Sequence, residues 1–378
     1  MAIITAFITE NGNALHRTFV EHIFKPTNTS LGFYRTDDNG SFTIDGGLAN
    51  RVDIRIHARN SVVKMLDGEN LNLPVAIERR VGNGDNINIT TSGERESFFR
   101  LQNVIIDVYD RVWRQFLPYS RAHRSEYPAG KKNTHRETFA SNQRIELSFP
   151  DRFNPQTISR SWVEPAGLLN ASLPLMHIRN TPTEVFSTPE HAWSLLAHET
   201  GHAMHFTALS LQKRIEIEVD YAAYIANVGN TPHDFDVAST PFVAFIEAIG
   251  IFSERFFYFT VFVSPALRGR ALQRAFTNDE LNERNLRNQN MGSEYKPIGT
   301  GSGNTFAPTS GLRGSNMEGA VYAAIYVDFA QRVGLSTAIN YIFNSQATTF
   351  DEYRSHIIGR NIAEHTTAIN AVRRRWGM

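Results

Sequence analysis

Three polar residues stand at metal-site spacing in the stretch SLLAHETGHAMHFTALS, residues 194–210. His198 and His202 are four residues apart, so on a helix both imidazoles lie on one face and can reach one metal ion. Glu199 lies about 100° around the helix from His198, beside such an ion rather than on it. The H-E-x-x-H pattern therefore predicts two zinc ligands and a general base, Glu199, for a zinc-activated water.

A catalytic zinc needs a third protein ligand, and the chain contains no cysteine to supply it. His205 lies about 10.5 Å along a straight helix from His198, so it cannot reach the same ion. We expect His205 to support the site or a neighbouring helix. The metzincin extension of the motif is excluded, because His205 stands at its glycine position and Ala208 at its last histidine position.

A carboxylate from a second helix is the remaining common solution. A strongly apolar helix is expected over about 241–263, and it carries Glu247 and Glu254 seven residues apart on one face. An unpaired carboxylate in such surroundings would cost several kcal/mol, which favours Glu247 as the third ligand. Glu254 either accepts a proton from a ligand histidine or pairs with an arginine. The rival carboxylates lie in a charged, solvated-looking stretch: Glu216, Glu218 and Asp220.

The first ~90 residues are rich in short β-type segments separated by turn signals such as Asn11-Gly12 and Asn39-Gly40. Strands are expected at 2–9, 30–36, 40–45, 51–58 and 61–66, followed by a Gly/Asn-rich linker at 79–97. The segment YRTDDNGSFTIDGG…VDIRIHARNSVVKMLD resembles the transthyretin-like, carboxypeptidase-regulatory type of β-sandwich. Asp37, Asn39 and Ser41 allow a calcium loop, but a solvated hairpin is the better interpretation.

Helical periodicity begins near residue 95, where we place the domain boundary. The stretch 97–117 has an apolar stripe at helical spacing. Strand-like pieces follow at 143–150 and 173–179. Thr188-Pro189 then marks the start of the helix that carries the motif, expected over about 188–209. Helices are also expected at 319–333 and 336–343, after a Gly/Ser/Pro-rich loop at 291–316 that either covers the substrate or is a plain linker.

Lys and Arg together number 38, as do Asp and Glu, so the formal net charge is zero. Nothing in this balance points to nucleic acid or to an anionic membrane. No run of about 18 apolar residues predicts a membrane-spanning helix. The N-terminus lacks the basic region of a signal peptide, which favours a cytoplasmic protein; an exported protein whose signal was removed is the alternative.

The strings HETGHAMH and FIEAIGIFSER resemble the gluzincin zinc metallopeptidases, most closely the thimet-oligopeptidase type. The resemblance covers roughly residues 188–340 and implies that Glu247 is the third ligand, with Glu254 seven residues on. The chain departs in its longer interval from His202 to Glu247, in Gly250 at a usual serine position, and in its shorter length. The family also places a tyrosine opposite the metal as an oxyanion donor, which implies Tyr322 or Tyr326. Both tyrosines also fit as core aromatics.

The sequence thus predicts an α+β multidomain chain: a β-sandwich at 1–90 and a mainly helical, zincin-like domain at 95–378. The predicted function is zinc-dependent hydrolysis of peptide bonds in a peptide or protein substrate, with Glu199 as the base. A first alternative is a zinc hydrolase for a non-peptide amide or ester. A second is a non-enzymatic, metal-stabilised binding protein, although a structural site needs no base and no open position.

Overall fold

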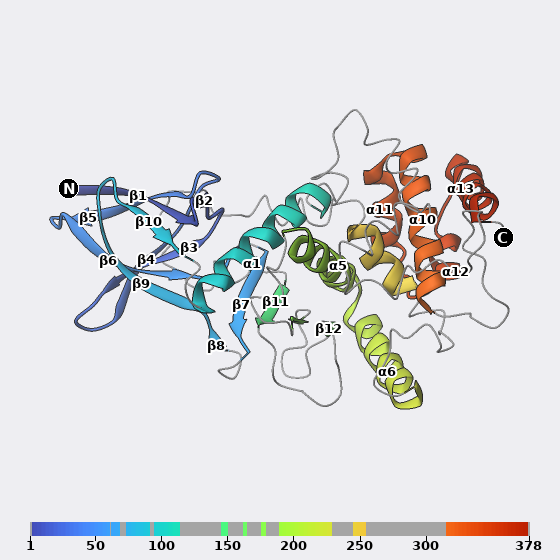
Figure 1. Ribbon diagram of the computed structural model, residues 1–378, viewed down its shortest axis with the longest axis horizontal. Coiled ribbons are helices and arrows are strands. Elements are labelled where there is room, and N and C mark those ends of the chain that lie inside the picture. Colours follow the sequence, from blue (N-terminus) through green and yellow to red (C-terminus); the bar gives the residue numbers. More distant parts are fainter. Residues whose placement is uncertain are drawn as a thin grey trace.

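The fold is a mixed α+β arrangement in which an N-terminal β-sheet region is followed by helices (Figure 1). The computed structural model describes ten stretches of the chain. They are residues 2–60, 62–68, 73–90, 94–113, 145–149, 162–164, 175–178, 189–228, 245–254 and 315–376.

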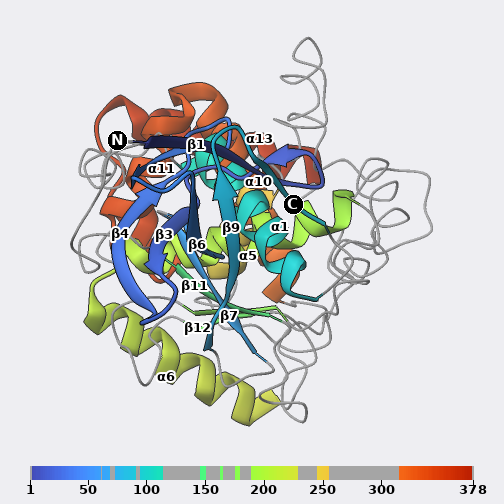
Figure 2. The same cartoon turned by 90° about the vertical axis from the view of Figure 1, so that its left-hand side faces the viewer.

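Two four-stranded sheets form the N-terminal region (Figure 2). One has the order β10-β1-β2 with β5 also paired to β1, and the other has the order β4-β3-β6-β9. Alternate side chains of the two sheets, such as Ile4 and Ile8 on β1 and Ile54 and Ile56 on β6, belong to one buried cluster. The strands are β1 (Ala2–Glu10), β2 (Asn13–Ala14), β3 (Phe19–Phe24), β4 (Thr29–Arg35), β5 (Ser41–Gly47), β6 (Arg51–His57), β9 (Ala76–Gly82) and β10 (Asn86–Ile89).

One of the two expected hairpins is present. Asn11 and Gly12 have φ values of 46° and 81° and join β1 to β2, as the Asn-Gly signal predicts. In the next turn, an Asp37 carboxylate oxygen accepts hydrogen bonds from the backbone N–H groups of Asn39 and Ser41, at 2.9 and 2.8 Å. The carboxylate therefore closes the turn itself, which argues against a calcium loop. The strands on either side of this turn, β4 and β5, belong to different sheets, so the hairpin predicted here is wrong.

The prediction of a linker at 79–97 is wrong, because β9, β10 and a helix that begins at Glu94 occupy twelve of its 19 positions. Ile87 and Ile89 on β10 are buried and alternate with exposed asparagines. β10 pairs with β1 in parallel, and β9 pairs with β6 antiparallel. The glycine and asparagine residues of this segment predicted a loop. A strand forms instead because the alternating isoleucines, Ile87 and Ile89, are buried in the core of the N-terminal sheets.

A third sheet joins strands from both sides of the domain boundary expected near residue 95. Its order is β12-β13-β11-β7-β8. β7 pairs in parallel with β11, over Val63–Ile145 to Asp67–Phe149. The strand predicted at 61–66 is therefore present, but it lies outside the two N-terminal sheets. The strands are β7 (Val63–Asp67), β8 (Leu73–Pro74), β11 (Ile145–Phe149), β12 (Trp162–Glu164) and β13 (Leu175–His177).

Helices are present where they were expected at 97–117, 188–209, 319–333 and 336–343, as far as the structure describes these ranges, but the helices at 211–228, 350–355 and 360–376 were not predicted. The stripe in α1 is buried at Phe98, Leu101 and Ile105. A segment at 245–254, yellow-orange in Figure 1, is also helical and lies within the range expected for the third-ligand helix. Within the described stretches no helix is long and apolar enough to cross a membrane. The other helices of the described stretches are α1 (Glu94–Val108), the π-helical turn η1 (Tyr109–Trp113), α5 (Pro189–Ala208), α6 (Leu211–Val228), α10 (Ser315–Val333), α11 (Leu335–Asn344), α12 (Phe350–Ser355) and α13 (Arg360–Trp376).

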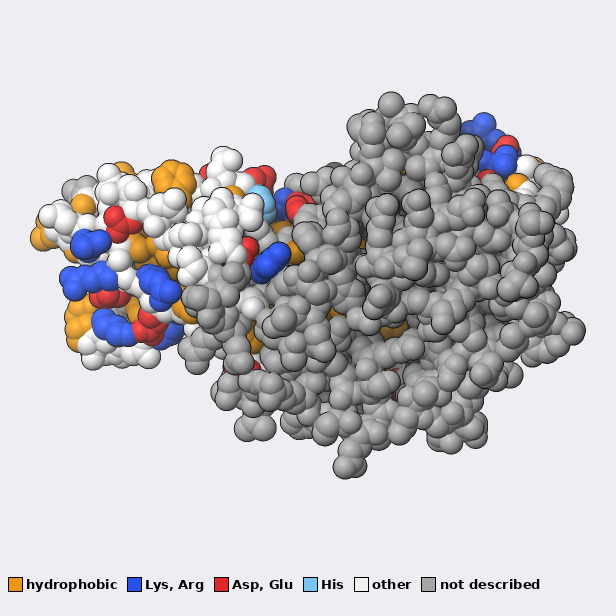
Figure 3. All heavy atoms as spheres, viewed as in Figure 1, with side chains coloured by type: hydrophobic (Ala, Val, Ile, Leu, Met, Phe, Trp, Pro, Cys, Tyr) orange, Lys and Arg blue, Asp and Glu red, His pale blue; other side chains and the backbone are white. Residues whose placement is uncertain are grey.

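The loop predicted at 291–316 lies almost wholly outside the described residues. On the N-terminal sheets, Lys and Arg side chains alternate with Asp and Glu in the view of Figure 3. Arg55 pairs there with Glu21 and Glu78, at 3.2 and 2.8 Å. This face carries paired charges of both signs, as the zero net charge of the chain suggests.

A buried histidine, His365 on α13, makes the stability of the C-terminal helices depend on pH. Its ring packs against Phe329, Phe350 and Tyr353. Burial, helped by the charge of Arg354, lowers the pKa of His365 to about 4. In the unfolded chain His365 takes up a proton near pH 6.5. The buried neutral ring therefore makes its full contribution to the free energy of unfolding above that pH. It is lost as the pH falls towards 4.

We predict that His365→Phe flattens the pH dependence of stability. Between pH 7 and pH 5 the wild type should lose about 2 kcal/mol more than the variant, because only the wild type protonates here on unfolding. Urea unfolding at the two pH values measures this difference. His356→Gln, at an exposed position, is the control and should behave as wild type. Equal pH slopes for His365→Phe and wild type would contradict the prediction.

Candidate metal centre

Two helices cross in close contact at the candidate site, α5 and the segment 245–254. They run antiparallel, because His205 late in α5 contacts Phe245, while Ala197 early in α5 contacts Ser253. The contact depends on glycine. A Cβ on Gly201 would lie 2.7 Å from the Ser253 Cβ and 3.1 Å from the Gly250 Cα. The two helices could not approach each other so closely if Gly201 and Gly250 carried side chains.

The crossing brings His198, His202 and Glu247 together. The two Nε2 atoms are 3.0 Å apart, and a Glu247 carboxylate oxygen lies 3.4 Å from His198 Nε2. The other Glu247 oxygen is 3.9 Å from His202 Nε2. Two ligand atoms on one tetrahedral zinc are separated by about 3.4 Å, given Zn–N bonds of about 2.0–2.1 Å. The three side chains therefore have the donor types, the spacing and the convergence that a zinc ion requires.

Gly250 also shapes this cluster directly. A Cβ there would lie 2.7 Å from His198 Nε2 and 2.8 Å from His202 Nε2. The backbone of the segment 245–254 thus packs against the nitrogens that face Glu247. A serine at this position, as in the resembling family, would require the rings or the helix to shift.

The site is buried and rich in carboxylates. Glu247 and Glu254 are each 2% exposed. Burial opposes a charge on His198, but Glu247 and Glu254 together raise its pKa well above the usual value. Glu254 faces His198 Nδ1 at 3.8 Å, too long for a hydrogen bond but close enough for charge attraction. One carboxylate thus faces each nitrogen of the His198 ring, the arrangement that fixes a ligand histidine in other metal sites.

Glu199 lies next to the cluster and outside it. It is 5% exposed, and its charge contributes to the raised pKa of His198. It does not belong to the group of potential ligands formed by His198, His202 and Glu247. This placement outside the group of potential ligands agrees with the 100° offset expected on a helix.

His205 is fully buried one turn beyond His202 and does not join the cluster. Its ring packs edge-on against Phe245, with centroids 5.7 Å apart. Burial lowers the pKa of His205 to about 4, against the opposing effect of the Ala347 backbone. His205 is therefore a neutral core residue that supports the start of the segment carrying Glu247, as the axial distance suggests.

The two tyrosines lie among aromatic side chains. Tyr326 is 1% exposed, and its ring packs against Phe245 and Phe252. At 100° per residue those two phenylalanines face away from Glu247. Tyr322 is partly buried and stacks on Phe350, with centroids 4.2 Å apart. These contacts favour the core-aromatic interpretation, most clearly for Tyr326.

The rival carboxylates lie on α6, away from the cluster. Glu216 is exposed and pairs with Lys213 at 3.3 Å. Asp220 is exposed as well, and Glu218 is half-buried. None of the three belongs to the group of potential ligands found among the described residues.

Sequence reasoning missed two residues that hold the crossing together, Ser253 and Trp113. The Ser253 hydroxyl donates to the Ala197 carbonyl at 2.7 Å and accepts from the Trp113 indole N–H at 3.3 Å. Both side chains are fully buried. A serine within an apolar helix is a weak signal of such a bond, and nothing in the spacing links it to residue 113.

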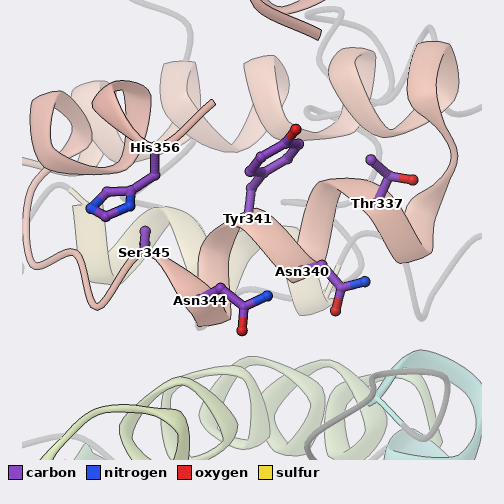
Figure 4. Close-up of a pocket in the computed structure, with 6 residues that line it drawn as sticks. All are labelled: Thr337, Asn340, Tyr341, Asn344, Ser345 and His356. Carbon is purple, nitrogen blue, oxygen red and sulfur yellow. The ribbon is translucent and has the colours of Figure 1, made fainter. Parts of the chain in front are cut away.

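A separate cavity of about 310 Å³ lies at α11 and the end of α12 (Figure 4). Among the described residues its lining offers hydroxyl, amide and imidazole groups and includes no carboxylate. It therefore lacks the combination of carboxylates and paired histidines found at the helix crossing. Its lining residues are Thr337, Asn340, Tyr341, Asn344, Ser345 and His356.

Comparison of the chain with protein-family models, curated proteins and solved structures gave no match. The function of the chain must therefore be inferred from the chemistry of the side chains at the site.

We predict that Gly250→Ala impairs metal binding. Alanine favours a helix by about 1 kcal/mol over glycine, but its methyl would displace the His198 and His202 rings. We expect zinc affinity to fall more than tenfold, measured by competition with a chromophoric chelator. Gly82→Ala is the control, since its nearest atom would be 3.4 Å away. Unchanged affinity in Gly250→Ala would show that the glycine does not shape the metal site.

We also predict opposite results for the two later histidines of the motif. His202→Ala should abolish stoichiometric zinc binding, because it removes one of three converging ligand atoms. His205→Phe should retain zinc, because His205 lies outside the group of potential ligands. A phenylalanine ring fits at this position, since the His205 ring packs against Phe206 and Phe245. Metal content after dialysis measures both. Equal losses would mean that His205 contributes to the ion's coordination.

Proposed function

We propose that this chain is a zinc-dependent peptidase. The observation that carries the proposal is the convergence of His198, His202 and Glu247 in a buried site, with Glu199 beside His198. This is the composition of a catalytic zinc site with three protein ligands and a neighbouring base. The resemblance to gluzincin peptidases supports the same chemistry.

His198 and His202 would hold zinc through Nε2, and Glu247 would hold it through a carboxylate oxygen. Bound there, zinc supplies a Lewis acid that activates a water molecule and polarises the substrate carbonyl. Glu199 is positioned to accept the water proton at its carboxylate and to pass it to the leaving nitrogen. The water oxygen joins the carbonyl carbon, the C–N bond breaks, and a carboxylic acid and an amine result.

Glu254 would orient His198. Its carboxylate faces Nδ1, so it favours the tautomer that carries a proton on Nδ1 and leaves Nε2 free to bind zinc. The substrate would be a peptide, or a segment of a protein, that reaches the helix crossing. The same residues could hydrolyse a non-peptide amide or ester, so substrate class is decided by assay.

The deciding experiment compares wild type with Glu199→Gln. Because Glu199 lies outside the ligand cluster, the variant should keep one zinc per chain. It should lose hydrolysis of a mixed peptide library by at least about 10²-fold, since proton transfer fails. Metal analysis and mass spectrometry of the digests are the measurements, with Glu216→Gln, at an exposed position on α6, as control.

Three other outcomes are informative. Wild type that binds zinc but cleaves only small amide or ester substrates would replace the peptidase proposal with the first alternative. Zinc binding with no hydrolysis by wild type would favour a metal-stabilised binding protein. Loss of zinc in Glu199→Gln would contradict the role assigned to that residue.

A further inference from the structure

The π-helical turn η1 lies between the N-terminal sheets and the metal site. It directly continues α1. On one side, Arg17 donates two hydrogen bonds to the Asp110 carboxylate, at 3.1 and 2.9 Å. Arg17 is 6% exposed and lies between β2 and β3. A two-point guanidinium–carboxylate contact fixes orientation as well as distance, so η1 is held in place against the N-terminal sheets.

On the other side, η1 reaches the helix of Glu247 through Trp113. The indole N–H donates to the Ser253 hydroxyl at 3.3 Å, and the ring packs against Phe343 of α11. An indole nitrogen can only donate. The Ser253 oxygen must therefore accept this bond, and its single proton remains available for another acceptor.

That acceptor is the Ala197 carbonyl, at 2.7 Å. Ala197 directly precedes His198, and Ser253 lies on the same short helix as Glu247. One buried hydroxyl therefore joins the helix of two ligands to the helix of the third. The neighbouring glycine contact brings the helices close, but hydrogen atoms on glycine give little resistance to sliding. The hydrogen bond from Ser253 to Ala197 fixes the position of the two helices along each other.

We propose that η1 is a positioning element for the metal site. The Arg17–Asp110 contact holds η1 to the N-terminal sheets, and Trp113 holds Ser253, which fixes Glu247 relative to His198 and His202. This inference rests on the proposed zinc site. It assigns to the N-terminal region a part in setting ligand geometry. Groups that orient metal ligands from outside typically change affinity or activity by about 10–100-fold when removed.

The test uses Trp113→Phe, which keeps an aromatic ring but removes the N–H, and Ser253→Ala, which removes one oxygen. We expect each to weaken zinc binding by about tenfold. The double variant should lose about as much as the larger single loss, because both act through one chain of contacts. Arg17→Met should cause a smaller loss in the same direction. Dissociation constants come from competition with a chromophoric chelator.

A second readout separates positioning from mere stability. In cobalt-substituted protein, the visible absorption bands report ligand geometry, and we expect them to shift in all three single variants. Two controls remove comparable contacts elsewhere. Tyr341→Phe removes the Asn361–Tyr341 hydrogen bond of 3.0 Å, and Arg55→Met removes the Glu21 and Glu78 ion pairs. Both should lower the melting temperature and leave the zinc affinity and cobalt spectrum unchanged.

The outcomes distinguish this inference from the proposed function. Wild type that binds no zinc refutes the function and the inference with it. Wild type that binds zinc, with wild-type affinity and cobalt spectrum in Ser253→Ala and Trp113→Phe, refutes the inference alone. Ser253→Ala keeps the Cβ that packs near Gly201, so it decides the matter even if Trp113→Phe fails to fold. Equal spectral shifts in the two controls would also overturn it.

Discussion

The close contact of Gly201 with Gly250 is the constraint on which the candidate site depends. The ligand atoms lie on two helices, and they converge only where the backbones approach within the reach of an imidazole. The segment 245–254 has two different faces. One presents Glu247, Gly250 and Glu254 to α5, and the other buries Phe245 and Phe252 among aromatic side chains such as Tyr326. Burial of the aromatic face of this segment favours the orientation in which its glycine face contacts the histidines of α5.

Charge explains why such an arrangement calls for a cation. Glu199, Glu247 and Glu254 are each at most 5% exposed and surround the same histidine. Moving carboxylates out of water costs several kcal/mol each unless a positive charge compensates. A proton on His198 supplies one such charge, in keeping with its raised pKa. In the proposed site a divalent ion would supply two positive charges and replace that proton, so zinc uptake would release a proton.

Much of the site could be predicted from local spacing, and much of the surrounding fold could not. His198, Glu199 and His202 share one helix, where the 3.6-residue period determines which side chains converge. Glu247 was predictable because a buried carboxylate in apolar surroundings demands a partner. The contacts of Trp113 and Ser253 span 140 residues in sequence, and no period reports them. For the same reason, the pairing of β7 with β11 was not foreseen, since strand propensity does not identify the partner.

The N-terminal region is tied to the rest of the chain at several independent places. β7 enters the third sheet beside β11, and Asn103 of α1 binds the backbone of Ala14 and His16. Arg17 then holds η1 through Asp110. These contacts explain how ligand geometry can be maintained although 45 positions separate His202 from Glu247. Lengthening a connection costs little, about 0.6 kcal/mol for each doubling. Packed helices and buried hydrogen bonds, rather than the length of the connecting chain, therefore set the distances at the candidate site.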